Sequence, residues 1–448
     1  MQHIPRLALF PDGTTVGPHG HLVIGGCDAV GLAREFGTPL YVFDEATLRR
    51  KCVEFKTEFG KRYPRPSVVY ASKAFFNRAL GLILKEEEMG LDVVSGGEVA
   101  VAQSVGFPFA KVYFHGNNKT EDEMKLALDA SIGYFVVDNF HELAVLNRLA
   151  KGQGIIQNIL LRLTPGVDPH THSHTTTGVL DVKFGFPMIK GIAEKAVAEA
   201  MSCSHLKLVG LHCHLGSPIF EMEPYEKAID IMMRFAAEMK ERHAFEMQEF
   251  SVGGGYAVQY LVDVPAPSVA QYAEAITARL QARCREMVLP LPRLVLEPGR
   301  AIVAQAGVAL YKVGAVKNIP GVRRYVCVDG GMSDNIRPAL YGAKYEALIA
   351  NNVGQGDSER VTVAGKLCES GDILIKDIML PPVSAGDLMA VPVSGAYCIP
   401  MSSNYNLALK PAIVLVKEGR ARLIRRRETH QDLMRCDLIR ARAVECGQ

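Results

Sequence analysis

The chain has 448 residues, more than the ~250–300 at which single hydrophobic cores stop growing, so two domains are expected. Its formal net charge is only +2, from 50 basic and 48 acidic residues, which argues against a nucleic-acid-binding surface. No apolar run approaches the ~20 residues of a membrane span, the ten cysteines stand singly without a CxxC pair, and the first residues lack the apolar segment of a signal peptide. We therefore expect a cytoplasmic protein that binds neither nucleic acid nor membrane.

In chain order, the first predicted elements are a short helix, which Asp28 can cap and Gly37 can end, and a strand over Pro39–Phe43. Eight strand-like segments follow, each succeeded by helical spacing, and they begin at Val68, Leu91, Lys111, Tyr134, Ile159, Leu208, Glu249 and Leu294. Their apolar runs do not alternate with polar residues, which is typical of parallel strands covered on both faces. Eight such units in roughly 230 residues predict an α/β fold, the (β/α)8 TIM barrel.

Beyond Arg300 the pattern changes to short β-rich segments separated by turns, such as those that begin at Gly307, Arg323 and Ala412. Few long helical patterns interrupt them, which predicts a mostly antiparallel C-terminal β-domain. We therefore expect a barrel domain over residues 40–300 and a β-rich domain formed by residues 1–39 and 301–448.

Polar residues and glycines follow each of the eight predicted barrel strands. They are Lys73, Asp92, Ser95–Gly97, His115, Gly116, Asp138, Arg162, His212, His214, Gly253–Gly255 and Glu297–Arg300. In barrels of this type the active site gathers at the C-terminal ends of the strands. The sequence therefore predicts that these side chains surround one site.

Lys73 ends the first of these strands, Val68–Ala74. Apolar neighbours would bury its amine, and a buried amine loses solvation when charged, so its pKa is expected to fall. Such a lysine is suited to forming a Schiff base with a carbonyl substrate or with pyridoxal phosphate. The alternative is a lysine that simply reaches solvent from the end of a strand.

Two glycine-containing motifs follow the last two barrel strands. Gly253–Gly255 lets backbone N–H groups approach an anion closely, and Glu297–Arg300 adds a further glycine and a guanidinium. Neighbouring positions at strands seven and eight are typical of phosphate sites in barrels. Glu297 could then face the protonated ring nitrogen of pyridoxal phosphate.

Nine motifs in this order carry a family resemblance: VVYASKA, LDVVSGGE, TTTGVLDVKFGF, GLHCHLGS, SVGGG, EPGR, IRPALY, CESGD and GAY followed by MSSNYN. From about Pro39 to Asp432 the chain resembles the diaminopimelate decarboxylases, a family of fold-type III pyridoxal-phosphate enzymes with an alanine-racemase-like barrel and a C-terminal β-domain. The resemblance implies a pyridoxal 5'-phosphate cofactor and no metal. It also implies decarboxylation of meso-2,6-diaminopimelate to L-lysine and CO2, the last step of lysine biosynthesis.

The resemblance also implies roles for individual residues. Lys73, His214 and Cys368 would be catalytic, with Lys73 bonded to the cofactor, His214 stacked on its ring and Cys368 donating a proton. The expected cofactor contacts are Lys73, Asp92, His214, Ser217, Gly253, Gly254, Gly255, Glu297, Gly299, Arg300 and Tyr397. The expected substrate contacts are Arg300, Arg337, Tyr341, Glu369 and Tyr397. Cys368 and Glu369 would come from the partner subunit of a homodimer with shared active sites, and Glu369 would bind the distal ammonium.

Other interpretations are weighed against this one. His212 and His214 at a strand end resemble paired metal ligands, and the run of His170, His172 and His174 adds to them, but the other strands carry no matching set. A catalytically inactive homologue conflicts with the presence of Lys73 and Cys368. Arg425–Arg427 is better explained as a solvated strand edge than as a nucleic-acid contact.

Within the same fold, an ornithine- or arginine-type decarboxylase is the main alternative. Those enzymes resemble this chain, but the ornithine enzymes typically carry aspartate after the cysteine, where this chain has Glu369. Arg337 also suits a substrate with a second carboxylate. Three departures from the family pattern leave cofactor affinity and substrate selection open: Pro218, Tyr345 and the segment Leu407–Lys410.

Overall fold

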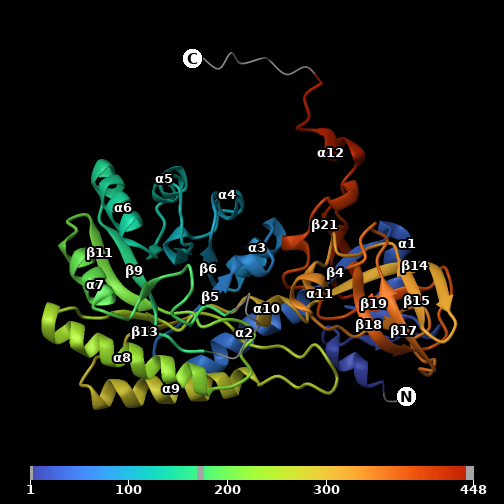
Figure 1. Ribbon diagram of the computed structural model, residues 1–448, viewed down its shortest axis with the longest axis horizontal. Coiled ribbons are helices and arrows are strands. Elements are labelled where there is room, and N and C mark those ends of the chain that lie inside the picture. The colour runs from blue at the N-terminus through green and yellow to red at the C-terminus, as the bar shows by residue number, and fades with distance from the viewer. Residues whose placement is uncertain (1–3, 169–175, 440–448) are drawn as a thin grey trace.

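The computed structural model describes residues 4–168 and 176–439 and contains a closed barrel beside a second sheet (Figure 1). The barrel strands are β5 (Pro66–Ala71), β6 (Gly90–Val93), β7 (Val112–Phe114), β8 (Tyr134–Val137), β9 (Gln157–Thr164), β11 (Leu206–His212), β12 (Glu249–Ser251) and β13 (Arg293–Leu296). Each is parallel to its neighbours, and the pairings β13–β5 and β8–β9 complete the ring. The predicted (β/α)8 barrel is confirmed.

One helix before the first barrel strand and further helices after the barrel strands surround the barrel (Figure 1). They are α2 (Glu45–Gly60), α3 (Arg78–Glu86), α4 (Gly96–Ser104), α5 (Glu121–Asp129), α6 (Phe140–Gln153), α7 (Ile192–Ser202), α8 (Glu223–His243), α9 (Val269–Glu286) and α10 (Arg300–Val303), with the short strand β10 (Phe186–Pro187) before α7. Side-chain caps begin several of them: Asn77, Ser95, Thr120 and Asn139 each accept a hydrogen bond from the first helical turn. These caps fix where each strand-to-helix loop ends, and so fix the loops at the barrel mouth.

The second sheet is mostly antiparallel, as the sequence predicts. Its strands are β4 (Leu40–Asp44), β14 (Gly307–Ile319), β15 (Arg323–Val328), β16 (Leu348–Ile349), β17 (Glu359–Ala364), β18 (Ile373–Leu380), β19 (Leu388–Val391), β20 (Ala412–Lys417) and β21 (Arg420–Arg425). Two pairs are parallel, β15–β17 and β4–β20. The long strand β14 pairs with β4 and β19 along its first half and with β15 along its second half.

The strand β4, which the predicted range 40–300 assigns to the barrel, lies in the second sheet between β14 and β20. Its five residues are all buried, so its apolar pattern resembles that of a barrel strand and the sequence alone does not separate the two. The N-terminal elements are η1 (Pro5–Leu9), β1 (Thr15–Val16), β2 (Leu22–Ile24), β3 (Cys27–Asp28) and α1 (Ala29–Phe36). They pack on this second sheet, where Leu22 and Ile24 share a core with Val308 and Val414.

Short elements complete the chain: η2 (Ser72–Ala74), η3 (Phe109–Lys111), α11 (Arg337–Tyr341), η4 (Ile399–Met401), η5 (Tyr405–Leu407) and α12 (His430–Met434). The turn η2 carries Lys73 directly after β5, and α11 carries Arg337. Among the described residues, no helix combines the length and the apolar character that crossing a membrane requires.

Candidate active site

A cavity at the C-terminal ends of the barrel strands collects most of the residues that the sequence proposes as cofactor contacts. Its lining is Ala71, Lys73, Asp92, His214, Ser217, Gly254, Gly255, Tyr256, Glu297, Gly299, Arg300 and Tyr397. Gly253 does not line it, because its N–H faces the protein and donates to the Ser251 hydroxyl at 3.1 Å. Eleven residues of this lining come from the barrel and its loops, and Tyr397 comes from the β-rich part of the chain.

The amine of Lys73 is subject to two opposing effects. Its side chain is reached by solvent along the cavity, although protein atoms surround the amine on its other sides. Burial lowers the pKa of Lys73, but the charges of Asp92, Tyr397 and Glu297 together outweigh it and leave the pKa above its ordinary value. The expectation of a lowered pKa is therefore wrong for this chain, because it considered the apolar neighbours of Lys73 and not the carboxylate on the next strand.

Asp92 ends β6, beside the strand that precedes Lys73. Burial raises the pKa of Asp92 to about 8, although Lys73 acts in the opposite direction. Its Oδ1 atom has no hydrogen-bond partner among the described residues. Buried carboxylate oxygens are normally satisfied, so this atom is available to a bound group.

Glu297 is held in a network of polar side chains at the end of β13. Its Oε2 lies 3.1 Å from His212 Nε2, and its Oε1 accepts a hydrogen bond from the Ser251 hydroxyl at 2.8 Å. Burial alone would raise its pKa, but His212 and the hydrogen bond from Ser251 hold the pKa well below its usual range. Glu297 therefore carries a stable negative charge on the cavity wall.

Two histidines that the sequence placed at strand ends without a role flank Glu297. His115 Nε2 lies 3.6 Å from Glu297 Oε1, and burial lowers the pKa of His115 well below its ordinary value, so this imidazole is neutral. The ligand-type atoms of His115, His212 and Glu297 lie within 4.8 Å of one another. This trio differs from the metal-ligand set considered from the sequence: His214 lines the cofactor cavity, and His170, His172 and His174 lie outside the described residues.

The opposite side of the cavity offers donors to an anion. Arg300 donates through Nε and Nη2 to the Ser217 hydroxyl, both at 3.3 Å, and the two side chains share the wall with Gly254 and Gly255. Gly255 has a φ of +105°, and a Cβ there would lie 2.5 Å from the Gly216 carbonyl oxygen. A side chain at position 255 would collide with this carbonyl, so this part of the wall requires glycine.

His214 lies between these two sides. The N–H of Gly254 donates to His214 Nδ1 at 3.2 Å, so this nitrogen is unprotonated. Burial lowers the pKa of His214 well below its ordinary value, and the neighbouring Lys73 adds to the effect. The side chain is therefore a neutral ring fixed against the cavity.

A second cavity of about 450 Å³ opens outward from the first and shares Lys73, His214, Ser217, Arg300 and Tyr397 with it. Arg337 and Tyr341, which the sequence proposes as substrate contacts, line this outer cavity. Further lining residues are Phe184, Pro218, Phe220, Val258, Tyr260, Leu261, Val264 and Lys344. Two arginines therefore face one space next to Lys73.

Tyr397 joins the two parts of the chain at the site. Its φ of 60° is in the left-handed region, and its N–H donates to the Ala74 carbonyl at 2.8 Å. The guanidinium carbon of Arg300 lies 4.9 Å from the centre of the Tyr397 ring. Tyr397 thus fixes the turn that carries Lys73 and covers Arg300.

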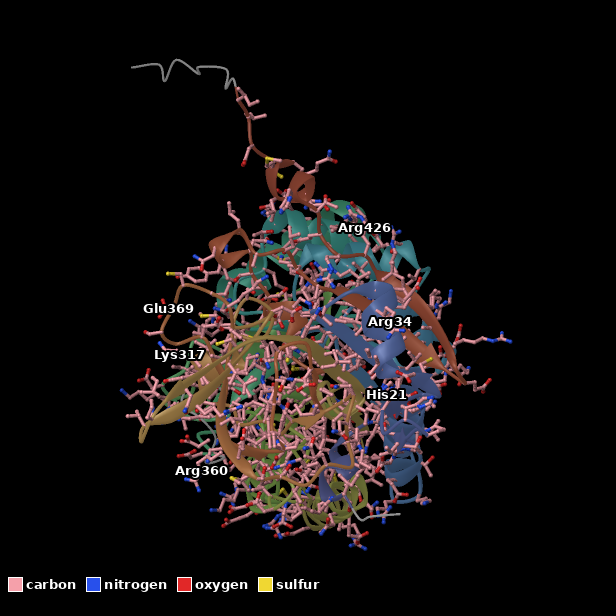
Figure 2. The ribbon with its side chains drawn as sticks, turned by 90° about the vertical axis from the view of Figure 1, so that its right-hand side faces the viewer. His21, Arg34, Lys317, Arg360, Glu369 and Arg426 are labelled. Atoms are coloured by element: carbon pink, nitrogen blue, oxygen red, sulfur yellow. The ribbon has the colours of Figure 1, made fainter. Side chains whose placement is uncertain are left out.

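Cys368 and Glu369 do not line either cavity. Both are exposed on the loop between β17 and β18, and Figure 2 shows Glu369 at the outer edge of the molecule. The Cys368 N–H donates to Asn406 Oδ1 at 3.0 Å, and Glu369 Oε1 accepts from the Gly371 N–H at 3.2 Å. The described chain thus brings Lys73, His214, Arg300, Arg337 and Tyr397 together and leaves these two residues outside.

Sequence reasoning gave no role to several residues of the site: His115, His212, Ser251, Tyr260 and Tyr345. The strand-end rule locates the two histidines, because they follow β7 and end β11. No comparable signal locates Tyr260 or Tyr345, which lie in loops. Tyr345 stands out in the sequence only as a departure from the family pattern.

Comparison with known proteins agrees with this geometry. A family model described as the pyridoxal-dependent decarboxylase, pyridoxal binding domain, matches residues 45–304. The barrel, its strand-end lysine and the adjoining cavity are thus those of a pyridoxal-dependent decarboxylase. The chain is 45% identical over 431 residues to the diaminopimelate decarboxylase of Bacillus subtilis (strain 168), covering 96% of this chain and 98% of that protein. It belongs to the diaminopimelate decarboxylase family.

Other relatives extend the comparison. The chain is 40% identical to the diaminopimelate decarboxylase of Mycobacterium tuberculosis (strain ATCC 25618 / H37Rv), covering 95% of this chain and 97% of that protein. The crystal structure of diaminopimelate decarboxylase from M. jannaschii in complex with L-lysine matches with a TM-score of 0.90 and 36% identity, over 96% of this chain and 98% of that one. A lysine/ornithine decarboxylase from Vibrio vulnificus shares the fold, with a TM-score of 0.73 at 22% identity over 87% of this chain and 97% of that one.

Proposed function

We propose that this protein decarboxylates meso-2,6-diaminopimelate to L-lysine and CO2 with pyridoxal 5'-phosphate as cofactor. The observation that carries the proposal is the joined pair of cavities: the inner one offers a lysine and an anion site, and the outer one adds Arg337 to the shared Arg300. The family membership, at 45% identity over nearly the whole chain, gives independent support. The L-lysine bound in the related structure from M. jannaschii is the product of this reaction.

The residues of the inner cavity fit the cofactor. Lys73 supplies an amine for a covalent bond to its aldehyde carbon, while Arg300, Ser217 and the glycines at 254 and 255 suit its phosphate. Glu297 stays ionised and suits a protonated ring nitrogen, and the unpartnered Oδ1 of Asp92 can accept a further hydrogen bond. When bound, the cofactor supplies an electron sink for the carbanion that decarboxylation leaves.

The residues of the outer cavity fit a substrate with two carboxylates. A guanidinium forms bidentate hydrogen bonds with a carboxylate, and Arg300 and Arg337 stand on the same wall. L-Ornithine and L-arginine lose their single carboxylate in decarboxylation, so they offer nothing for a second arginine to bind. Arg337 therefore favours diaminopimelate over the ornithine- or arginine-type alternative.

We further propose a homodimer in which Cys368 and Glu369 reach the partner's cavity, Cys368 to protonate the reacting carbon and Glu369 to bind the distal ammonium. Their exposure on one chain supports this, because a proton donor and a charge clamp must touch the substrate to act. Leu407, 73% exposed next to Asn406, offers apolar surface beside the same loop. A thiol donor must stay reduced, which agrees with a cytoplasmic location.

The test is to incubate the purified protein with pyridoxal 5'-phosphate and meso-2,6-diaminopimelate and to measure L-lysine and CO2. Parallel incubations with L-ornithine and L-arginine separate the alternative function, and Lys73→Ala serves as the inactive control. Equal amounts of L-lysine and CO2, with no product from the other two substrates, are expected. Turnover of L-ornithine or L-arginine in place of diaminopimelate would contradict the proposal.

A further inference from the structure

In the described part of the chain, the guanidinium of Arg337 is held by tyrosines. Its Nη1 donates a hydrogen bond to the Tyr345 hydroxyl, and its Cζ lies 5.4 Å from the centre of the Tyr345 ring and 4.8 Å from that of Tyr260. The two rings meet edge to face, with centroids 5.5 Å apart. Aromatic faces attract a guanidinium without neutralising it, so Arg337 keeps its charge for a ligand.

Tyr260 connects Arg337 to the second arginine of the cavity. Its hydroxyl accepts a hydrogen bond from Arg300 Nη1 at 2.9 Å, while its ring faces Arg337. Arg300, Tyr260 and Arg337 all line the outer cavity. The two guanidinium groups are therefore held on either side of one tyrosine, at a separation that the protein fixes before any ligand binds.

Tyr345 differs from these three because it stands behind Arg337. Its side chain is only 3% exposed, and it is not part of the cavity lining. It reaches the ligand space only through the two lining residues that it contacts, Arg337 and Tyr260. A residue in this place cannot touch the substrate, but it can decide where the guanidinium points.

The hydroxyl of Tyr345 is itself fixed from the other side. Its oxygen lies 3.6 Å from Cys398 Sγ, and that thiol donates to the Ala396 carbonyl at 3.7 Å. Since the Tyr345 oxygen accepts from Arg337, its own proton is directed to Cys398. A chain of hydrogen bonds therefore runs from backbone next to Tyr397 to the guanidinium of Arg337.

We propose that Tyr345 is a positioning residue that aims Arg337 at the carboxylate on the end of the substrate remote from the reacting carbon. The proposal rests on the proposed function for the identity of that substrate. Tyr345 and Arg337 together would make the outer cavity selective for ligands that carry this carboxylate over diamines that lack it. Tyr345, which departs from the family pattern, then takes part in substrate selection by this chain.

The first test is the kinetics of Tyr345→Phe, which removes the hydroxyl and keeps the ring. The remote carboxylate does not change during the reaction. Loss of the Tyr345 hydroxyl, which holds Arg337, should therefore weaken the binding of substrate and transition state equally. We expect KM for meso-2,6-diaminopimelate to rise about tenfold, since hydrogen bonds to charged groups have that effect, with kcat within about twofold of wild type. A fall in kcat at unchanged KM, or an unchanged KM, would overturn the proposal.

Tyr63→Phe is the matched control. The Tyr63 hydroxyl is buried and donates to the Pro292 carbonyl just before β13, at the end of the barrel away from the site. Tyr63→Phe removes the same hydroxyl group from a buried tyrosine, so a general loss of packing would change the KM of both variants. We expect KM of Tyr63→Phe to stay at the wild-type value.

The second test compares two ligands by calorimetry on the cofactor-loaded protein: L-lysine, and cadaverine, which is the same molecule without its carboxylate. Tyr345→Phe is expected to weaken L-lysine binding about tenfold and to leave cadaverine binding unchanged. Equal weakening of both ligands would show a packing role and overturn the proposal. Because it needs no turnover, this measurement still decides the role of Tyr345 if the protein fails to decarboxylate diaminopimelate.

A double-mutant cycle with Arg337→Lys separates action through Arg337 from action by another route. If Tyr345 works through the guanidinium, Tyr345→Phe should weaken L-lysine binding less than twofold once Arg337 is replaced. A repeated tenfold loss in the Arg337→Lys background would show independent action and contradict the proposal.

Discussion

At Lys73, burial and the surrounding charges change the pKa in opposite directions. Burial lowers the pKa of Lys73, and Asp92 on the neighbouring strand makes the largest of the charge contributions that together raise it above its ordinary value. A charged amine is not nucleophilic, so the reaction of Lys73 with the cofactor's aldehyde requires loss of a proton first. The pKa of Asp92 is itself raised to about 8, and the charges of Asp92 and Lys73 influence each other's protonation.

Asp92→Asn therefore tests this pair in the apoenzyme. Without the charge of Asp92, burial dominates and the pKa of Lys73 should fall, so the amine becomes reactive at lower pH. The rate of covalent attachment of pyridoxal 5'-phosphate, followed by absorbance across pH 7–10, should level off at lower pH in the variant than in wild type. Lys73→Ala gives the background from other lysines. Superimposable pH profiles of wild type and Asp92→Asn would contradict this assignment.

Individual residues differ in how far the sequence determines their place. Strand-end position brings Lys73, Asp92 and Glu297 to one cavity, because a closed parallel barrel places all strand ends on one rim. The contacts of Tyr345 join a loop residue to Arg337 of α11 and to Cys398, which is more than fifty positions away, so no local pattern encodes them. The raised pKa of Lys73 was missed for the same reason, since the charges that raise it lie on other elements of the fold.

At the scale of elements, apolar patterning predicted the eight barrel strands because each is covered on both faces. The strand β4 was predicted apart from these eight, but the domain boundary at residue 40 included it in the barrel domain, although it pairs with β14 and β20. Pairing partners depend on residues hundreds of positions away, which patterning does not contain. The loop that carries Cys368 was recognised by resemblance, and its exposure on the single chain comes from the structure.

The segment before α11 is anchored on the second sheet through Asp334. Its Oδ2 accepts hydrogen bonds from Tyr311 of β14 at 2.6 Å and from Tyr41 of β4 at 3.1 Å, and its Oδ1 accepts from the Gly331 N–H at 2.9 Å. Burial nevertheless raises the pKa of Asp334 to about 6. The element that carries Arg337 therefore depends on a carboxyl group that titrates near neutral pH.

Asp334→Asn should change the pH dependence of stability. Because the folded pKa of about 6 exceeds the ordinary 3.8, the protonated form stabilises the fold below about pH 4 and this contribution is lost as pH rises through 6. The difference between the ordinary pKa and the folded pKa corresponds to about 3 kcal/mol in the free energy of unfolding. The Tm of wild type relative to Asp334→Asn, measured by calorimetry from pH 4 to 7, should fall over this range. A pH-independent Tm difference would show that Asp334 does not titrate there.

At the scale of the whole molecule, the loop of Cys368 and Glu369 is ordered within its own chain. Asp372 accepts hydrogen bonds from the N–H groups of Leu367 and Met332, at 2.9 and 2.6 Å, and Asn406 accepts one from Cys368. The loop is therefore fixed without contacting the chain's own cavity. Presenting these two side chains on a rigid outer edge suits a shared site, because a preformed loop loses little entropy on docking.

Subunit mixing tests the shared site. Lys73→Ala and Cys368→Ala, each nearly inactive alone, are mixed under conditions that exchange subunits. In a mixed dimer with shared sites, one site has both defects and the other has none. Random pairing makes about half of the dimers mixed, so roughly a quarter of wild-type activity should return.

The matched control mixes Lys73→Ala with Arg300→Ala, two residues that line the same cavity of one chain, and no activity should return because every site keeps one defect. If Cys368 served its own chain, the test pair would behave like this control. An activity that stays flat across all mixing ratios, with subunit exchange verified by mass spectrometry of tagged chains, would therefore refute the shared site.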